Sequence, residues 1–373
     1  MPVKQRPDYL VIACAMVLLG FGVVMIFSSS AIIAVEKYND AYYFLKRQMM
    51  WASLGVIAML LMMRLDYRML RKYYYVIYIG VVLFLLLVFI PGVGVNVNGA
   101  HRWINLGLAT VQPSEFAKLG LIIFFAAFLA RKEAEGKLGD FIFGFAPSVA
   151  ALLLVFVLIQ LQPDLGTAVI VGLVAFSLFA VAGVRLAYLG GAILFAMPFL
   201  WAAVYNVGYR RRRLLSFLNP WDDLNDSGYQ IIQSFVALAR GGVWGSGLGN
   251  GRQKLFYLPE PHTDFIFSII GEEMGLIGGL AVMAVFAVLA WRGIRIGLRT
   301  QDKFGSLLAL GITFAITMQA LFNVSVTIGL LPTKGLPLPF ISLGGSALVM
   351  WMMSVGLLAN ISENGPGAAA GET

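Results

Sequence analysis

The sequence predicts an all-α, polytopic membrane protein with about ten transmembrane helices. Of its 373 residues, 60% are hydrophobic and only 12% are charged, whereas charged residues make up about a quarter of a soluble domain. The hydrophobic residues form long runs, and the lysines and arginines gather in short clusters between these runs. This distribution excludes an ordinary soluble enzyme. It also argues against a nucleic-acid partner despite the net charge of +8, because the charges do not form one basic surface.

Ten hydrophobic runs are candidates to cross a hydrocarbon core of roughly 30 Å, which takes about 20 helical residues. We expect these spans at Tyr9–Ser29, Met49–Met63, Tyr74–Ile90, Ser114–Ala130, Gly144–Leu161, Leu165–Ala182, Leu186–Tyr205, Phe265–Trp291, Leu307–Ile328 and Phe340–Ile361. The first run follows basic residues and lacks a small-residue cleavage pattern, so we expect a retained signal anchor. Together the spans form a single domain over residues 1–361.

The distribution of basic residues predicts the orientation in the membrane. The short loops on the same side of the membrane as the N-terminus hold most of the arginines and lysines in short loops. Loops rich in these residues face the cytoplasm. Both termini are therefore expected in the cytoplasm, with residues 362–373 as a disordered tail. Residues 91–113 and 206–264 then form extracytoplasmic loops. The run Arg210–Arg213 conflicts with this placement, but long loops are translocated largely regardless of their charge.

Three acidic or basic residues lie near the end of the second long loop. Asp264 directly precedes the eighth span, where it caps the helix, acts as a general base with a pKa raised by partial desolvation, or does both. His262 is more readily a hydrogen-bonding loop residue than a metal ligand, because no second nitrogen or sulfur ligand lies at a suitable spacing. Glu272, and not Glu273, lies roughly on the Asp264 face of the helix, and these two carboxylates either form a structural pair with a buried cation or act in an outer cavity. The single cysteine, Cys14, excludes a disulfide framework.

Basic and aromatic residues in the other outer segments are candidate ligand contacts. Lys118 in the first turn of the fourth span pairs with Glu115, extends to the interface, or faces a diphosphate together with Arg102 and the arginines at 210–213. The alternative for these four arginines is binding of anionic lipid head groups. Trp103 is either an interfacial anchor or a platform for a sugar ring. Lys334 lies in a proline-rich loop and is another candidate phosphate contact.

Six motifs occur in order along the chain, at Asn98–Ile104, Gln112–Lys118, Gln162–Thr167, Tyr257–Phe267, Gly271–Glu273 and Leu331–Pro339. In these motifs and in its ten-span layout, the chain resembles the SEDS family of bacterial cell-wall proteins, named for shape, elongation, division and sporulation. The sequence Thr333-Lys334-Gly335 resembles the division branch of the family more than its elongation branch.

This resemblance implies a peptidoglycan glycosyltransferase of the bacterial cytoplasmic membrane, enriched at the division septum. It would polymerise lipid II into glycan strands at the outer face and release undecaprenyl diphosphate. The resemblance implies that Asp264 is the catalytic residue. The candidate substrate-binding residues are Arg102, Trp103, Lys118, His262, Thr263 and Lys334, with Glu115 and Glu272 in possible support. The implied partners are a class B penicillin-binding protein, which is a transpeptidase, and other division proteins, besides membrane lipid.

Two questions stay open at this point. No cofactor is required by the sequence, although a divalent cation, Mg²⁺ or Mn²⁺, is compatible with diphosphate chemistry. Two functions are alternatives to the glycosyltransferase. The protein could be a flippase or transporter that moves the same lipid, or a non-enzymatic scaffold that activates a transpeptidase. The polar residues gather at one interface, whereas a carrier places its binding site near the middle of the membrane. This argues against the carrier.

Overall fold

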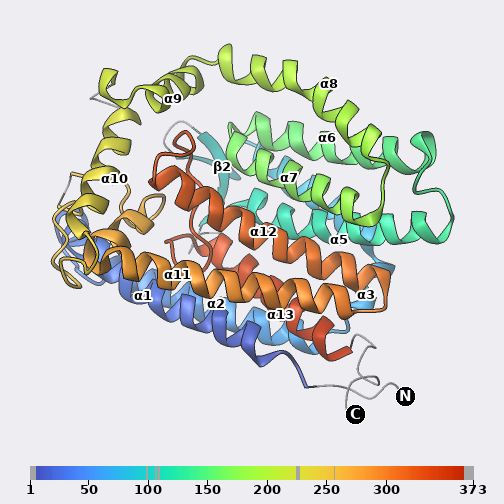
Figure 1. Cartoon of the computed structure of the whole chain (residues 1–373), viewed down its shortest axis with the longest axis horizontal. Helices are drawn as coiled ribbons and strands as arrows, with labels where there is room; N and C mark the ends of the chain where they lie inside the picture. The colour runs from blue at the N-terminus through green and yellow to red at the C-terminus, as the bar shows by residue number, and fades with distance from the viewer. Residues whose placement is uncertain are drawn as a thin grey trace.

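The computed structural model describes residues 6–97, 100–105, 107, 110–223, 227–255 and 257–364. Its helices are α1 (Tyr9–Tyr38), α2 (Tyr43–Arg64), α3 (Arg68–Lys72), α4 (Tyr74–Leu87), α5 (Pro113–Ala134), α6 (Ala146–Leu161), α7 (Leu165–Ala182), α8 (Leu186–Tyr205), α9 (Gly208–Leu218), α10 (Ser227–Gly241), α11 (Ile266–Arg299), α12 (Lys303–Thr327) and α13 (Gly345–Asn364). A π-helical turn, Phe141–Phe145, precedes α6, and a 3₁₀ turn, Pro220–Asp222, follows α9. Most helices run side by side as one bundle (Figure 1).

The predicted helical membrane bundle is confirmed. Among the described residues, nine helices are long and apolar enough to cross a membrane, namely α1, α2, α5, α6 with its preceding turn, α7, α8, α11, α12 and α13. The remaining predicted span corresponds to α4, an apolar helix of 14 residues. Both ends of the described chain lie at the same end of the bundle, where the Asp8 backbone N–H donates to Ser362 Oγ at 2.9 Å (Figure 1). An even number of crossings therefore needs α4 as the tenth.

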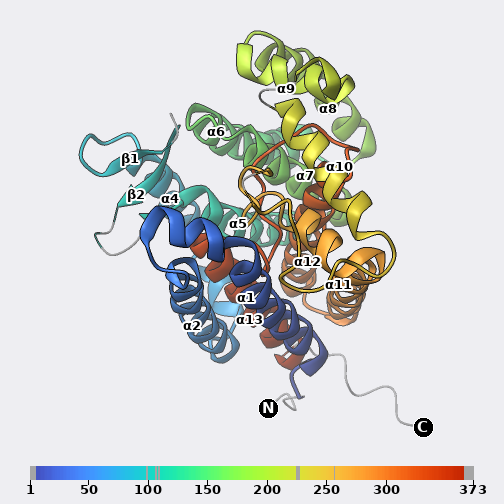
Figure 2. The ribbon, with the colours of Figure 1, turned by 90° about the vertical axis from the view of Figure 1, so that its left-hand side faces the viewer.

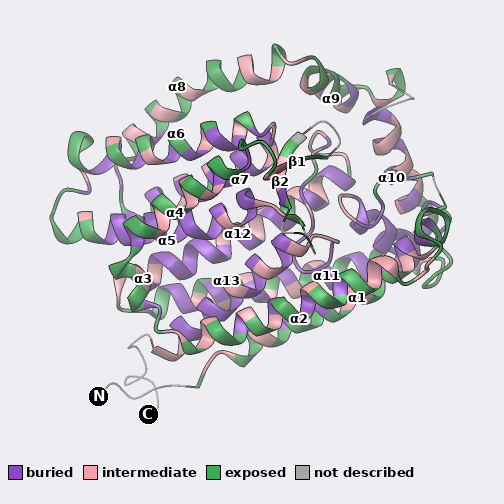
Figure 3. Ribbon diagram, turned by 180° about the vertical axis from the view of Figure 1, so that it is seen from behind, coloured by how far each residue is buried: buried purple, intermediate pink, exposed green. Residues whose placement is uncertain are grey.

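The centre of the bundle is α5. This helix is buried along most of its length and packs against α4, α7, α12 and α13 (Figure 3). By contrast, the main helix contacts of α8 are with its neighbours in sequence, α7 and α9, and it stands apart from most of the bundle (Figures 2 and 3). Its exposed apolar side chains suit a lipid environment, because hydrocarbon takes the place of protein neighbours there.

Two predictions about the outer segments are wrong in detail. Residues 91–113 were predicted as a loop, but they contain three short strands, β1 (Gly94–Val97), β2 (Ala100–Asn105) and β3 (Thr110–Val111). These strands form an antiparallel sheet in the order β1-β2-β3. The all-α prediction missed this sheet, whose short strands are marked only by an alternation of polar and apolar residues. The predicted loop over residues 206–264 contains α9 and α10, and α10 packs against α11. At the C-terminus, residues 362–364 still belong to α13, and the rest of the predicted tail lies outside the described residues.

A break in α11 fixes the segment that follows α10. Gly275 adopts φ 68° and ψ −168° inside this helix. This conformation is unfavourable for residues that have a Cβ atom. The break frees the carbonyls of Glu272 and Glu273, which accept hydrogen bonds from Ser246 and Gly247. The N–H groups of residues 276 and 277 donate to residues 242 and 243 in turn. The loop after α10 thus supplies hydrogen-bond partners for the backbone groups that the break in α11 leaves unpaired. Such groups need partners within the protein in a membrane environment.

Candidate active site

A cavity of about 660 Å³ lies at the end of the bundle opposite the termini. Its walls come from β2, the start of α5, α9, the segment before α11, and the segment between α12 and α13. Six residues proposed from the sequence line it, namely Arg102, Trp103, Glu115, Thr263, Asp264 and Lys334. The fold therefore brings together residues from four separate motifs.

The backbone around Asp264 is held from two directions. Asn323 on α12 donates from Nδ2 to the Asp264 carbonyl at 2.8 Å and to the Leu336 carbonyl at 2.9 Å. Ser342 donates from Oγ to the preceding carbonyl, that of Thr263, at 2.6 Å. Because these bonds join the segment before α11 to α12 and to the loop after it, the position of Asp264 is set by contacts distant in sequence.

The Asp264 carboxylate is free for chemistry. Helix α11 begins at Ile266 with Phe265 as its cap residue, and no side chain caps this end. The helix-cap interpretation of Asp264 is therefore wrong. Within the part of the chain that the structure describes, neither carboxylate oxygen makes a hydrogen bond or an ion pair. Gly335 forms a close wall beside it, since a Cβ atom there would lie 3.0 Å from Oδ2.

The surroundings of Asp264 bring its pKa close to neutral. Burial, followed by the negative charge of Glu260, raises the pKa of this carboxyl from 3.8 to about 7. The positive charges of Arg213 and Arg102 act in the opposite direction. A carboxylate with a pKa near the working pH is suited to general-base catalysis, because it is ionised often enough to accept a proton and basic enough to hold it.

Three cations share the cavity with Asp264. Arg102 donates from Nε to the Gln162 carbonyl at 3.0 Å, and Arg213 donates from Nη1 to the Thr333 carbonyl at 3.5 Å. Burial lowers the pKa of Lys334, the third of them. No ion pair joins any of these three to a carboxylate in the described ranges. Their positive charge is therefore available to an anionic ligand.

The position of Lys118 decides among its three predicted roles. Its ammonium lies 2.7 Å from Glu115 Oε2 and 2.7 Å from Gln319 Oε1, and it stacks over the Trp351 ring at 4.8 Å. Only 2% of the residue is exposed. The Glu115 pair is therefore the arrangement observed. Lys118 does not line the Asp264 cavity, so the predicted direct contact with a diphosphate is not supported: its charge is already matched inside the bundle.

His262 is also turned away from the cavity. Its ring is buried and packs against the Phe44 ring, with 4.7 Å between the ring centroids. Burial lowers the pKa of His262, which favours the neutral imidazole. The predicted contact between this side chain and substrate is therefore not supported, whereas the neighbouring Thr263 and the half-buried Trp103 both line the cavity.

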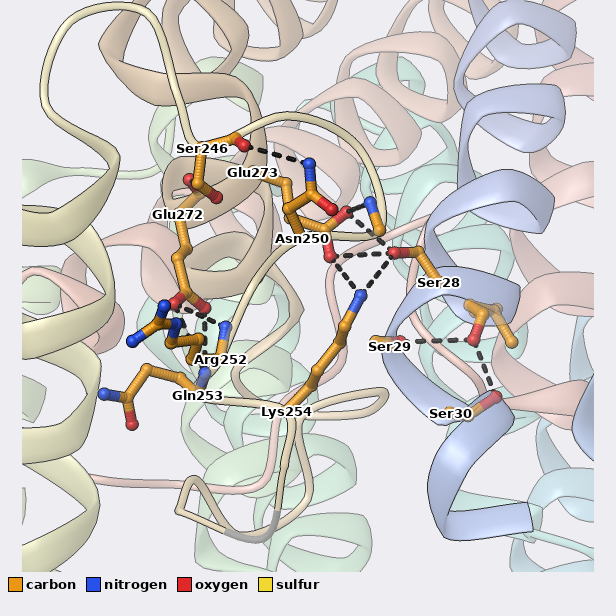
Figure 4. Close-up of polar contacts among 12 residues, drawn as sticks. Ser28, Ser29, Ser30, Ser246, Asn250, Arg252, Gln253, Lys254, Glu272 and Glu273 are labelled. Carbon is orange, nitrogen blue, oxygen red and sulfur yellow. Dashed lines mark hydrogen bonds and ion pairs between the residues drawn. The ribbon is translucent and has the colours of Figure 1, made fainter. Parts of the chain in front are cut away.

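Glu272 does not reach the cavity either, and it is not the residue that holds a cation. Its carboxylate accepts hydrogen bonds from the backbone N–H groups of Arg252 and Gln253 (Figure 4). The next residue, Glu273, pairs with Lys254 Nζ at 2.6 Å and also accepts from Ser28 Oγ of α1 (Figure 4). The predicted pairing of these two carboxylates with a buried cation is therefore confirmed at Glu273 and wrong for Glu272, and neither carboxylate lines the cavity. The two carboxylates together fasten the segment before Asp264 to α11 and α1.

The cavity wall includes residues that the sequence did not single out as site residues, among them Glu260, Arg213 and Gln230. Glu260 lies four residues before Asp264 within the Tyr257–Phe267 motif, so its position was a usable signal. Arg213 belongs to the run of arginines, but nothing in the sequence distinguished it from its neighbours. Gln230 comes from α10, a helix that the sequence analysis did not predict.

The described residues offer no ready-made metal site. No three side chains among their His, Cys, Asp and Glu lie close enough together to hold a metal ion. The described residues therefore form no three-ligand metal site by themselves, and the mechanism below routes no step through a metal ion.

Comparison with known proteins identifies the family of this chain. The model of a cell cycle protein family, FtsW/RodA/SpoVE, matches residues 8–365. The chain belongs to the FtsW/RodA/SpoVE family. This family member is 48% identical over 358 residues to a Geobacter metallireducens protein named "Probable peptidoglycan glycosyltransferase FtsW", covering 96% of this chain and 95% of the relative. It is 43% identical over 360 residues to stage V sporulation protein E of Bacillus subtilis, with 96% and 98% covered.

Solved structures with the same fold agree with this membership. One chain belongs to a peptidoglycan synthase complex described as coordinating polymerization and crosslinking. It has a TM-score of 0.78 and 27% identity, and the match covers 96% of this chain and 98% of that one. The rod shape determining protein RodA of Thermus thermophilus gives a TM-score of 0.71 at 27% identity, with 96% and 97% covered. The FtsW/RodA/SpoVE family member described here is a multi-pass membrane protein.

Proposed function

We propose that this protein is a peptidoglycan glycosyltransferase that polymerises lipid II into glycan strands at the outer face of the bacterial cytoplasmic membrane. The observation that carries the proposal is the unpartnered carboxylate of Asp264, which lines a cavity of about 660 Å³ together with three cations. The relatives named as peptidoglycan glycosyltransferases support it. Their FtsW name also supports a role in cell division, with enrichment at the septum.

The proposed reaction is a single displacement. Asp264 removes the proton from the 4-hydroxyl of the acceptor sugar while that oxygen attacks the anomeric carbon of the donor. The bond between this carbon and the diphosphate oxygen breaks, and undecaprenyl diphosphate leaves with inversion at the carbon. The proton remains on Asp264 until solvent removes it. A second acid is not needed, because cations stabilise the departing diphosphate, unlike the alkoxide that leaves in glycoside hydrolysis.

Arg102, Arg213 and Lys334 supply that stabilisation in the proposed mechanism. Their charges face the cavity without a carboxylate partner, so they are positioned before the reaction rather than rearranged during it. Trp103, which also lines the cavity, provides an apolar face for a sugar ring.

We also propose a class B penicillin-binding protein as the partner. The similarity to a chain from a complex that coordinates polymerization and crosslinking supports this partner, because a transpeptidase would crosslink the strands as they form. Other division proteins are expected to join this pair at the septum.

The decisive experiment supplies lipid II to the purified protein, with and without its transpeptidase partner, and measures glycan strands by gel electrophoresis. Wild-type protein should form polymer, and Asp264→Asn should form none, because the amide cannot accept the proton. Asp66→Asn at the opposite end of the bundle is a matched control and should retain full activity. Equal polymer from wild type and Asp264→Asn would show that the carboxylate is not the base. Movement of lipid between leaflets without any polymer would favour a carrier instead.

A further inference from the structure

A second, smaller chamber adjoins the Asp264 cavity. It has a volume of about 140 Å³ and lies between the QPD turn at 162–164, the corner between α8 and α9, and the segment 332–335. Arg102, Arg210, Arg213 and Lys334 line it from three different parts of the chain, and we call it the arginine chamber. Arg102, Arg213 and Lys334 also line the larger cavity, so the two spaces meet at these side chains.

The positive charge of the arginine chamber is not neutralised. Arg210 donates from Nε to Tyr209 Oη and from Nη1 to the Ala203 carbonyl, both at 2.9 Å, and these acceptors carry no charge. The acceptors of Arg102 and Arg213 are also uncharged, because both side chains donate to backbone carbonyls. Four like charges held together with one carboxylate are costly, and such an excess of positive charge is typical of a site that binds an anion.

The single carboxylate among the residues that line the chamber is already engaged. Asp164 accepts hydrogen bonds from the Thr167 backbone N–H at 3.1 Å, from Thr167 Oγ1 at 2.8 Å and from Gln112 Nε2 at 3.1 Å. These bonds cap the start of α7 and hold the carboxylate in place. Four cations therefore face one carboxylate whose oxygens are committed to the fold.

A buried hydroxyl offers an additional contact. Thr333 also lines the arginine chamber, and only 2% of this residue is exposed. Within the described residues its Oγ1 has no hydrogen-bond partner. A buried hydroxyl without a partner is unfavourable, and a phosphate oxygen would accept a hydrogen bond from it.

The larger cavity has a different charge pattern. Glu115, Glu260 and Asp264 line it together with the three shared cations, so negative and positive groups are mixed there. A diphosphate is repelled by these carboxylates and attracted to the arginine chamber, whereas neutral sugar hydroxyls suit the mixed surface.

We propose that the arginine chamber binds the diphosphate of the glycosyl donor, while the acceptor sugar occupies the larger cavity beside Asp264. The inference rests on the proposed function for the identity of the donor. The shared cations then lie at the bond that breaks, between the leaving diphosphate and the attacking hydroxyl. Arg210 and Thr333 line only the arginine chamber, so this inference adds both residues to the contacts of the diphosphate.

The arrangement of four consecutive arginines on α9 provides a matched control. Arg210 and Arg213 are three residues apart, so they share a face of the helix and line the chamber. Arg211 and Arg212 point elsewhere and line neither space. The double variants R210Q/R213Q and R211Q/R212Q remove the same charge from the same helix, and only the first removes it from the chamber.

The test measures equilibrium binding of undecaprenyl diphosphate to the purified full-length protein in detergent. R210Q/R213Q should weaken the Kd at least about tenfold, since hydrogen bonds from charged groups to the diphosphate are lost. R211Q/R212Q should stay within about twofold of wild type. R210K/R213K keeps the charge and should lie between the two. Undecaprenol, which lacks the diphosphate, should bind all four proteins equally. Gel filtration confirms that each variant is folded.

Three results would overturn the inference. These are equal weakening in both glutamine variants, no weakening in R210Q/R213Q, and displacement of undecaprenyl diphosphate by phosphatidylglycerol at equal concentration. The last result would identify a general site for anionic lipid. Asp264→Asn separates this inference from the proposed function, because it should abolish polymerisation without weakening the binding of undecaprenyl diphosphate. A wild-type protein that binds as expected but makes no polymer would refute the proposed function alone.

Discussion

The ionisation of Asp264 should control the pH dependence of polymerisation, and Glu260→Gln should shift that dependence to lower pH. Burial raises the pKa of Asp264 from 3.8 to about 7, and the charge of Glu260 is the next contribution in the same direction. Only the ionised carboxylate accepts a proton, so the rate should fall roughly tenfold for each pH unit below 7 and level off about one unit above it. Without the Glu260 charge the pKa falls, but burial still holds it above 3.8.

The assay compares initial rates of lipid II polymerisation by wild type and Glu260→Gln over a series of pH values, as kcat/KM. Gln keeps the side-chain oxygen that lies 3.3 Å from Thr263 Oγ1, so the local structure changes little. The wild-type midpoint should lie near pH 7, and the variant midpoint should lie lower. Glu133→Gln is the control, because Glu133 pairs with Lys303 at the opposite end of the bundle. A variant midpoint equal to or above that of wild type would refute the electrostatic account.

Three further predictions concern stability, measured as thermal unfolding in detergent. Asp264→Asn should stabilise the protein, because the folded pKa of about 7 lies above the unfolded value of 3.8. Ionisation therefore costs stability progressively between these values, and the gain should grow over that window to at most about 4 kcal/mol above pH 7; a gain that shrinks with pH would contradict this. Lys118→Met should cost about 3–5 kcal/mol by leaving Glu115 buried without its partner, and adding Glu115→Gln should recover most of the loss. Gly275→Ala should destabilise, since a Cβ there would meet the Val243 carbonyl and φ is positive, whereas Gly80→Ala should not, because nothing lies within 4 Å of its Cβ position.

The membrane architecture could be predicted from local composition. The spans Leu165–Ala182 and Leu186–Tyr205 were predicted with the bounds that the structure has, because the thickness of the hydrocarbon core fixes the length of an apolar run. Other helices, such as α11, continue past the predicted end at Trp291 to Arg299. Their polar ends leave the hydrocarbon but keep helical hydrogen bonds, so hydrophobicity does not mark where they stop.

The outer segments were predicted less well. Helices α9 and α10 and the small β-sheet are short, and they depend on contacts with other elements rather than on their own composition. For this reason the sequence predicted loops there. It could not single out Arg213 from the four arginines or Gln230 from α10, although both line the cavity.

The hydrophobic runs of the sequence predict a bundle of membrane helices, with Asp264 directly before the start of one of them. Contacts in the folded chain were needed to show that Asp264 faces a cavity without capping its helix, that Lys118 is matched by Glu115, and that Glu273 rather than Glu272 holds a buried cation. Hydrophobicity and helix periodicity depend on residues close in sequence. Burial and charge pairing depend on residues brought together from distant segments, as Asn323 and Asp264 are, and no local pattern records those contacts.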